Sequence, residues 1–394
     1  MKIATAQRLD GIGEYYFATK LRQLDDMRAK GIDIINLGIG SPDLPPHDSV
    51  IAALAQSAAQ PANHAYQPYK GILALRKAMA DWYALYYGVS LNADTDILPL
   101  IGSKEGVVHV CMTWLGNGDA ALVPNPGYPA YAAAVKLAGA MPHYYSLTEE
   151  NDWFPDLELL QSQLQGNEKL MFVNYPHMPS GKAAGYGQLA QLVAFAKRNN
   201  ILLVSDNPYS FILNDNPLSL LSLPGAMDVA VELNSLSKSH NMAGWRVGML
   251  CGSAERISQV LQFKSNMDSG MFRPIQEAAV AALGLGSGWY QQLNEVYARR
   301  RSLVHQLLDD LGCSYGTQQA GLFVWARIPE QEKDGYGLSD KVLAATGVFI
   351  TPGGIFGSRG NGYVRVSLCC SEAMLQKATS AVKNHLETTN TKSA

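Results

Sequence analysis

The sequence feature that most constrains the fold is an alternation of apolar strands with amphipathic helices between about residues 47 and 285. The helix expected over 187–199 shows the 3.6-residue period, with Leu189, Leu192 and Ala196 on one face. Strands that alternate with helices form βαβ units, so the pattern predicts an α/β domain of three layers with a mainly parallel sheet. The predicted strands cover residues 97–102, 120–124, 143–147, 169–174, 201–206, 229–237 and 247–252.

The pattern changes after residue 285. A long charged helix, strands separated by a helix, and a final helix with Ser371 as its N-cap predict a smaller α+β domain. A chain of 394 residues is longer than one hydrophobic core usually spans. The sequence therefore predicts three parts: an N-terminal arm (1–45) that packs with the small domain, a large domain (46–285) and a small C-terminal domain (286–394). The strands expected in the small domain cover 321–328, 348–350 and 363–368.

Charge and composition exclude several classes of protein. The net charge of −3 creates no basic field that would attract nucleic acid or an anionic membrane. No apolar run reaches the roughly 20 residues of a membrane-spanning helix, and the first residues lack the apolar stretch of a signal peptide. The five cysteines have no CxxC spacing and the eight histidines form no HExxH pair. We expect a cytoplasmic protein with no metal site and with neither nucleic acid nor membrane as a partner.

Ligands of open α/β sheets bind beyond the carboxyl ends of the strands. The first predicted strand runs into Gly102, Ser103 and Lys104, which open an apolar helix. Backbone N–H groups at such a helix start are unpaired and favour a phosphate. An ordinary helix start with Ser103 as the N-cap is the alternative.

Asp206 ends another strand, and Tyr209 follows three residues later. A carboxylate at the end of an apolar strand is partly desolvated and needs a partner to stay charged, which a cationic ring nitrogen can supply. A helix cap or a salt bridge explains the same position equally well.

The end of the strand over 229–237 carries Ser235 and Ser237, and the loop after it carries Arg246. The side chains of these three residues can converge on a phosphate. Lys238 lies between them. A lysine beside an anion site can serve as an imine-forming amine. For a lone lysine, exposure on a loop is the more common fate.

Together these residues form the pattern S-x-S-K-x5-G-x-R-x-G at 235–248, which resembles the pyridoxal-phosphate lysine motif of the class I/II aminotransferases, the fold-type I group. Further blocks follow in the order of that family over nearly the whole chain. They are NLGIGSPD (36–43), YQPYKG (66–71), GSKEG (102–106), PNPGYPAY (124–131), NYPHMPSG (174–181), DNPY (206–209), PGGIFG (352–357) and YVRVSL (363–368). Within the family, INLGIGSPDLP and KSNMDSGMF are most similar to the branch with LL-diaminopimelate and some aspartate aminotransferases.

The resemblance implies a pyridoxal 5'-phosphate enzyme that moves an amino group from an α-amino acid to an α-keto acid. Lys238 would form the imine with the cofactor and shuttle the proton at the substrate Cα. Asp206 would pair with the pyridinium nitrogen, and Tyr209 would donate to the phenolic oxygen. Tyr128 would stack on the ring, although a core aromatic is the simpler reading of that residue alone. The phosphate would be held by Gly102, Ser103, Lys104, Ser235, Ser237 and Arg246.

The resemblance also assigns the substrate contacts. Arg365 would hold the α-carboxylate in a bidentate fork, with Asn174 beside the carboxylate and cofactor and Gly38 offering a backbone N–H. Tyr66 would reach the phosphate of a partner subunit, which implies a homodimer with shared active sites. The amino acid substrate stays open between diaminopimelate, aspartate, aromatic amino acids and methionine. An acidic substrate would need a second cation for its distal carboxylate, and Arg273 is a candidate for this cation by its position alone.

One block departs from the family. The loop N-x-P-x-N-P-[ST]-G has asparagine where this chain has Met178 in NYPHMPSG. A thioether donates no hydrogen bond to the phenolic oxygen, so Tyr209 acts alone or with His177 or a water. The missing donor predicts a higher pKa of the cofactor's imine.

The departure keeps another pyridoxal-phosphate reaction open, an α,β-elimination by a C–S β-lyase. A third possibility is a binding module of the kind that some bacterial regulators fuse to a winged helix. The sequence has no basic DNA-binding segment, which argues against this possibility.

Overall fold

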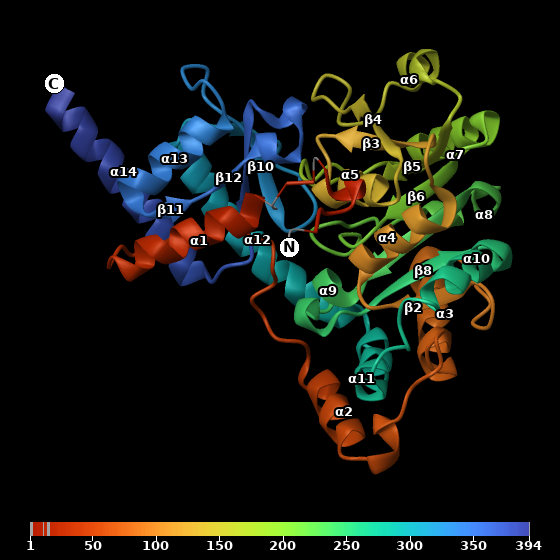
Figure 1. Cartoon of the computed structure of the whole chain (residues 1–394). Coiled ribbons are helices and arrows are strands. Elements are labelled where there is room, and N and C mark those ends of the chain that lie inside the picture. The colour runs from red at the N-terminus through yellow and green to blue at the C-terminus, as the bar shows by residue number, and fades with distance from the viewer. Residues whose placement is uncertain (1–2, 11, 14–15, 394) are drawn as a thin grey trace.

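A sheet of seven strands forms the centre of the larger part of the molecule, in the order β2-β8-β7-β6-β5-β3-β4 (Figure 1). The structure is a computed structural model and describes residues 3–10, 12–13 and 16–393. All pairings are parallel except those of β8 with β2 and β7. The mainly parallel sheet is therefore confirmed. The strands are β2 (Ile97–Leu100), β3 (Ala120–Asn125), β4 (Met141–Ser146), β5 (Glu168–Val173), β6 (Leu202–Asp206), β7 (Ala230–Ser235) and β8 (Gly248–Gly252).

The reversal of β8 follows from the short link that precedes it. Between β7 and β8 the chain forms only the one-turn helix α9 (Leu236–Ser239) and a 3-10 turn (Ala243–Trp245). A parallel return requires a longer crossover, usually a full helix across one face of the sheet.

Helices cover both faces of this sheet (Figure 1). Leu170 and Phe172 of β5 face a core shared with α4, α5 and α10, whereas Met171 and Val173 face a core shared with α3 and α7. Both sets are apolar because a sheet covered on both sides has no solvated face. The helices of this part are α2 (Asp48–Ala58), α3 (Leu73–Tyr87), α4 (Ser103–Trp114), α5 (Pro129–Leu137), α6 (Leu157–Gln163), α7 (Tyr186–Asn199), α8 (Ala226–Val229), α10 (Ala254–Lys264) and α11 (Arg273–Leu283).

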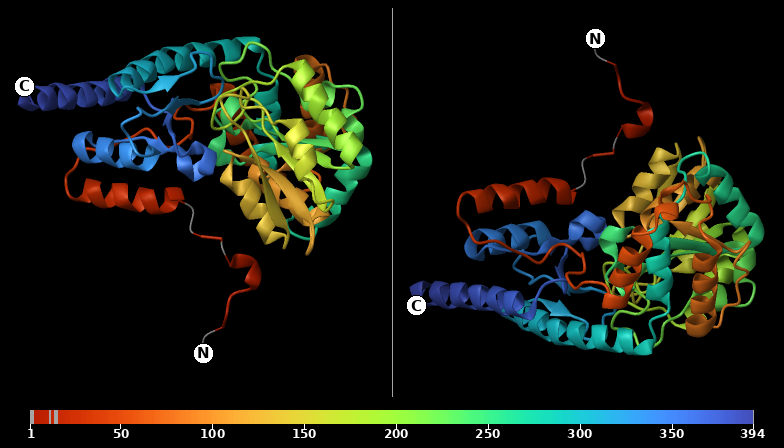
Figure 2. Two further views of the ribbon diagram at one scale, coloured as in Figure 1. Left: turned by 90° about the horizontal axis from the view of Figure 1, so that it is seen from above. Right: turned by 90° about the horizontal axis from the view of Figure 1, so that it is seen from below.

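A four-stranded antiparallel sheet, in the order β12-β13-β10-β9, forms the second part. The N-terminal α1 lies beside α13, where Lys20 pairs with Asp340 at 3.0 Å (Figure 2). The short strand β1 pairs with β11 in parallel. The sequence predicts a helix over residues 14–30, and residues 14 and 15, its expected start, lie outside the described residues. The elements are α1 (Tyr16–Ala29), β1 (Ile35–Asn36), α12 (Ser287–Asp310), β9 (Ser314–Tyr315), β10 (Phe323–Arg327), α13 (Gly335–Thr346), β11 (Val348–Phe349), β12 (Thr351–Pro352), β13 (Tyr363–Ser367) and α14 (Glu372–Ser393).

The strand registers bring the candidate loops to one edge of the large sheet. Gly248 pairs with Leu100 on one side and with Ser235 on the other, and Asp206 pairs with Leu233. The ends of β2, β6 and β7 therefore lie close together. None of the helices within the described ranges has the length and apolarity that crossing a membrane requires.

Candidate active site

A cavity of about 550 Å³ opens at this edge, between the large sheet and the antiparallel sheet. Its volume lies within the few hundred to about 1,000 Å³ of small-molecule sites. Ala18 and Leu21 of α1 and Phe323 and Phe356 of the second part complete the wall. The structure brings together at this cavity the predicted residues Ser103, Lys104, Tyr128, Asn174, Asp206, Tyr209, Ser235, Ser237, Lys238, Arg246 and Arg365.

The start of α4 and the start of β8 approach each other closely at this cavity. Gly102 is the N-cap of α4 with φ of 83°, so Ser103 is the first helical residue and not the cap. A Cβ on Gly102 would lie 2.0 Å from Nη2 of Arg246, and one on Gly248 would lie 2.7 Å from the backbone nitrogen of Ser103. Only glycine fits at both positions, and the helix start, where backbone N–H groups are unpaired, lies beside the guanidinium.

Hydroxyl groups from the end of β7 and from α9 join this arrangement. The Oγ of Ser235 donates to the Oγ of Ser237 at 2.8 Å and accepts from the backbone N–H of Ser237 at 3.1 Å. Arg246 has a left-handed backbone with φ of 59°, and its Nη1 donates to the carbonyl of Ala243 at 2.8 Å. Two hydroxyls, a guanidinium and a helix N-terminus thus form one anion-binding surface.

Lys238 is a partly buried amine beside this surface. Its Nζ donates to the carbonyl of Gly40. Burial lowers the pKa of the Lys238 ammonium below its ordinary value, and the positive charges of Arg365 and Arg246 lower it further. A lowered pKa increases the fraction of neutral amine, the form that acts as a nucleophile.

Asp206 at the end of β6 presents an unsatisfied carboxylate oxygen. Its side chain is buried, and Oδ2 accepts a hydrogen bond from the hydroxyl of Tyr131 at 2.7 Å. Among the described residues, Oδ1 has no hydrogen-bond partner. Burial raises the pKa of Asp206 to about 6, against the lowering effect of the Tyr131 hydrogen bond, and Glu232 raises it further. A buried acceptor on a cavity wall is suited to a cationic N–H donor.

Arg365 enters the cavity from β13. Its guanidinium lies between two aromatic rings, 3.7 Å from the ring centre of Phe323 and 4.5 Å from that of Phe356. Nη2 donates to the carbonyl of Gly38 at 3.0 Å, and Nη1 lies 3.3 Å from the sulfur of Met178. These contacts hold the guanidinium plane in one orientation, as bidentate binding of a carboxylate requires.

Several predicted residues lie elsewhere. The N–H of Gly38 donates to Asn36 at 2.9 Å, and its carbonyl accepts from Arg365 at 3.0 Å and from Thr351 at 2.9 Å. Tyr66 is 92 % exposed. Arg273 pairs with Glu277 at 2.7 Å in a separate surface pocket, so it supplies no second cation here.

His177 is buried beside the loop that carries Met178, and its ring does not reach the cavity. One ring nitrogen lies 2.7 Å from the Oγ of Ser180 and the other 3.2 Å from the carbonyl of Pro126. Met178 itself lines the cavity, and its backbone N–H donates to Asn174 at 2.7 Å. The alternative in which His177 supplies the missing donor therefore has no support in the geometry.

Sequence reasoning missed Tyr131 and the residues of α1 at the cavity. Tyr128 is the N-cap of α5 and Tyr131 lies three positions later, in the first turn of the helix, so the sequence places the two side chains near each other at the start of α5. Ala18 and Leu21 share a face of α1 through helical spacing, but only the packing of α1 against the second part brings that face to the cavity.

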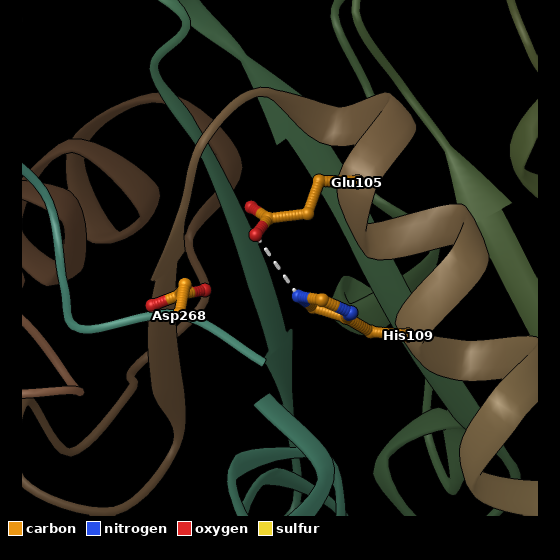
Figure 3. Close-up of side chains that lie close together, drawn as sticks. All are labelled: Glu105, His109 and Asp268. Carbon is orange, nitrogen blue, oxygen red and sulfur yellow. Dashed lines mark ion pairs between the residues drawn. The ribbon is translucent and has the colours of Figure 1, made fainter. Parts of the chain in front are cut away.

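A second group of ionisable side chains, away from the cavity, joins α4 to the segment after α10 (Figure 3). Glu105, His109 and Asp268 have the residue types of a metal site, and Nε2 of His109 lies 3.1 Å from Oε1 of Glu105. The buried Lys264, however, donates to both carboxylate oxygens of Asp268, at 2.5 and 2.7 Å. Because this ammonium already supplies the positive charge, we interpret the group as a buried salt-bridge network.

Comparison with known proteins identifies the family. The family model "Aminotransferase class I and II" matches residues 32–382. An LL-diaminopimelate aminotransferase from Oleidesulfovibrio alaskensis is 41% identical over 96% of this chain and 98% of its own length. The LL-diaminopimelate aminotransferase of Dehalococcoides mccartyi is 40% identical over the same shares of the two chains.

Solved structures agree with this assignment. Substrate-bound BacF from Bacillus subtilis has a TM-score of 0.92 at 34% identity and covers 98% of both chains. A probable N-succinyldiaminopimelate aminotransferase from Thermus thermophilus has a TM-score of 0.87 at 30% identity, over 94% of this chain and 99% of its own. These matches confirm the predicted fold type. The chain belongs to the class I and II aminotransferase family.

Proposed function

We propose that this transaminase uses LL-diaminopimelate as its amino donor. Membership of the family makes it a pyridoxal 5'-phosphate enzyme with an amino acid and a keto acid as substrates. The choice of donor is supported by the two relatives named above, which match nearly the whole chain and are LL-diaminopimelate aminotransferases.

The residues at the cavity fit the cofactor. The start of α4 with Ser235, Ser237 and Arg246 suits its phosphate. Oδ1 of Asp206, which has no partner in the part of the chain that the structure describes, suits a protonated ring nitrogen. When bound, pyridoxal phosphate supplies an electron sink that stabilises negative charge on the substrate Cα. We propose that Lys238 would hold the cofactor through its amine and would carry the proton at that carbon.

The remaining residues bind and orient. Arg365 takes the α-carboxylate, and the rings of Phe323 and Phe356 hold its guanidinium plane in place. Burial raises the pKa of Tyr209, so its phenol stays protonated and can donate to the phenolic oxygen of the cofactor. Tyr128 packs on the ring face, and Asn174 holds the loop of Met178 against the end of β6.

One observation of the structure supports the transaminase chemistry, whereas the choice of donor rests on the relatives named above. A lysine with a lowered pKa, a buried carboxylate oxygen that has no hydrogen-bond partner among the described residues, and an arginine packed between two rings line one cavity. The test is a panel of amino donors with 2-oxoglutarate, pyruvate and oxaloacetate, with Lys238→Ala as the blank. We expect the highest kcat/KM with LL-diaminopimelate and none in the blank.

Each other result of the panel has its own meaning. A clear preference for aspartate, an aromatic amino acid or methionine would remove the diaminopimelate proposal and keep the transaminase. Pyruvate and ammonia formed from a β-substituted amino acid without a keto acid would indicate the β-lyase reaction. Activity that survives in Lys238→Ala would remove the role of that lysine.

We further propose a homodimer in which Tyr66 reaches the partner's cofactor phosphate. The proposal is supported by the exposed aromatic and apolar side chains Tyr66, Met267 and Phe272, which are 92 %, 51 % and 42 % exposed. Burial of such side chains is a major source of stability at subunit interfaces. Sedimentation should show a dimer. Tyr66→Phe should weaken cofactor binding and leave the sedimenting species a dimer. A monomer with full activity would contradict the shared site.

We propose the cytoplasm as the location of the protein, in keeping with the five unbonded cysteines.

A further inference from the structure

We propose that Tyr131 positions Asp206 for the cofactor: it occupies one carboxylate oxygen and leaves the other for the ring nitrogen. The inference rests on the proposed function, because it concerns the same cavity. It adds a residue to which nothing in the family motif assigns a role.

The contact is short and excluded from solvent. The hydroxyl of Tyr131 lies 2.7 Å from Oδ2 of Asp206, and the two residues are 1 % and 5 % exposed. A carboxylate has two oxygens that can accept, and a partner on one of them fixes the direction of the other. Oδ1, without a partner among the described residues, is thus the oxygen left for the cofactor.

Tyr131 is itself held firmly. Its ring stacks on Phe172 of β5 with centroids 4.8 Å apart and planes 10° apart. The ring of Tyr128 meets it edge to face at 5.5 Å. The start of α5 therefore holds Tyr128, its N-cap, and Tyr131, in its first turn, beside the cavity, and β5, the strand next to β6, supports the ring of Tyr131. A donor packed in this way keeps its direction when the cofactor enters or leaves.

The surroundings of Asp206 give this hydrogen bond a chemical effect. Burial and the neighbouring Glu232 of β7 both favour the protonated carboxyl group. The hydrogen bond from Tyr131 is the contact that favours the charged form. Without it, Asp206 would hold a proton more readily and would pair less well with a protonated ring nitrogen.

The test is nitrogen-15 NMR of the holoenzyme, with the label in the pyridine ring of the cofactor. In Tyr131→Phe we expect the chemical shift of the ring nitrogen to move toward that of an unprotonated ring. We also expect cofactor binding to weaken by about tenfold, since a hydrogen bond to a charged group is lost. The ring stack on Phe172 stays in place in this variant, so only the hydroxyl is removed.

Tyr145→Phe is the matched control. Tyr145 is also buried, and its hydroxyl donates to the carbonyl of Phe172 and not to Asp206, at the same distance of 2.7 Å. We expect a comparable loss of stability in both variants, and changes in nitrogen signal and cofactor affinity only in Tyr131→Phe. An unchanged signal and affinity in Tyr131→Phe, or equal changes in the control, would overturn the inference.

Two further outcomes can be interpreted: a variant that does not fold, and a wild-type protein that binds no cofactor. If Tyr131→Phe does not fold, Phe172→Leu removes the ring beneath the tyrosine and keeps the hydroxyl. A smaller weakening of cofactor binding is then expected, and no weakening would count against the role of Tyr131. If the wild-type protein binds no pyridoxal phosphate, the proposed function fails first and the inference fails with it.

Discussion

The carboxyl group of Asp206 lowers the stability of the cofactor-free protein at neutral pH. Its pKa is raised by burial from 3.8 to about 6. For a group whose pKa is higher in the folded state, the folded chain binds the proton more tightly. The resulting stabilisation is present below pH 3.8 and is lost as the pH rises through 6.

We therefore predict that Asp206→Asn stabilises the apoprotein at neutral pH. The amide has no charge to desolvate, so above pH 6 the apo variant should be more stable than the apo wild type by about 2–3 kcal/mol. The difference should shrink below pH 4, and cofactor binding should be severely weakened. Urea unfolding of both apoproteins from pH 4 to 8 measures this. Equal stability across the range would show that the carboxylate is satisfied in the apo state.

Met178 is the second residue with a distinct expectation. Its thioether contacts Arg365 and offers no donor to the cofactor. Met178→Asn should lower the pKa of the visible absorption band of the bound cofactor by about one unit, since the amide can donate to the ionised phenolic oxygen. A pH titration of the band is the measurement, and Met178→Leu should leave the band unchanged. An unshifted band in Met178→Asn would mean that the side chain does not reach the cofactor.

At the scale of elements, the site depends on how closely β8 approaches the start of α4. Gly248 makes this approach possible, because a Cβ there would meet the backbone of Gly102 and Ser103 at 2.8 and 2.7 Å. Backbone atoms cannot rotate away as the end of a flexible side chain can. The spacing between a strand and a helix therefore determines where the phosphate-binding N–H groups lie.

Gly248→Ala should push the start of α4 out of place and weaken cofactor binding by at least tenfold, together with a loss of about 1–3 kcal/mol in stability. Gly252→Ala, at the other end of β8, is the control, since its added Cβ would meet the side chain of Val231 at 3.0 Å. Fluorescence titration with the cofactor and thermal unfolding separate the two effects. Similar cofactor affinities in both variants would contradict the argument from spacing.

At the scale of the whole molecule, we propose the division into an arm (1–45), a large domain (46–285) and a small domain (286–394). The pairing of β1 with β11 and the contact of α1 with α13 support the association of the arm with the small domain. An ion pair between the buried Arg300 and the more exposed Asp43 joins the same parts. Arg300 of α12, 3 % exposed, donates to both carboxylate oxygens of Asp43 at 2.6 and 2.9 Å and to the carbonyl of Leu368 at 3.1 Å.

Asp43→Ala should destabilise the fold by about 3 kcal/mol, because it leaves a buried guanidinium without its counter-charge. The exposed pair of Arg28 and Asp25 on α1 provides the control. There Asp25→Ala should change stability by less than about 1 kcal/mol, since solvent screens the interaction. Denaturant unfolding gives both values. A loss in Asp43→Ala no larger than that in the control would show that Arg300 is satisfied by Leu368 and solvent.

The sequence by itself determined the class of fold, the strands of the large sheet and most of the cavity wall. These follow from local patterns: the period of apolar residues, and side chains placed where strands end. The blocks around Lys238, Asp206 and Arg365 belong to this set, since motif order reflects the order of the strands.

Only the tertiary structure decided the direction of β8, the partner of Asp206, and the packing of Arg365 between Phe323 and Phe356. It also showed that Gly38 supports Arg365 through its carbonyl and that His177 does not reach the cavity. The reason is physical. Spacing along one chain reports which residues share a face, whereas contacts between Tyr131 and Asp206, or between α1 and the cavity, depend on how separate elements pack together.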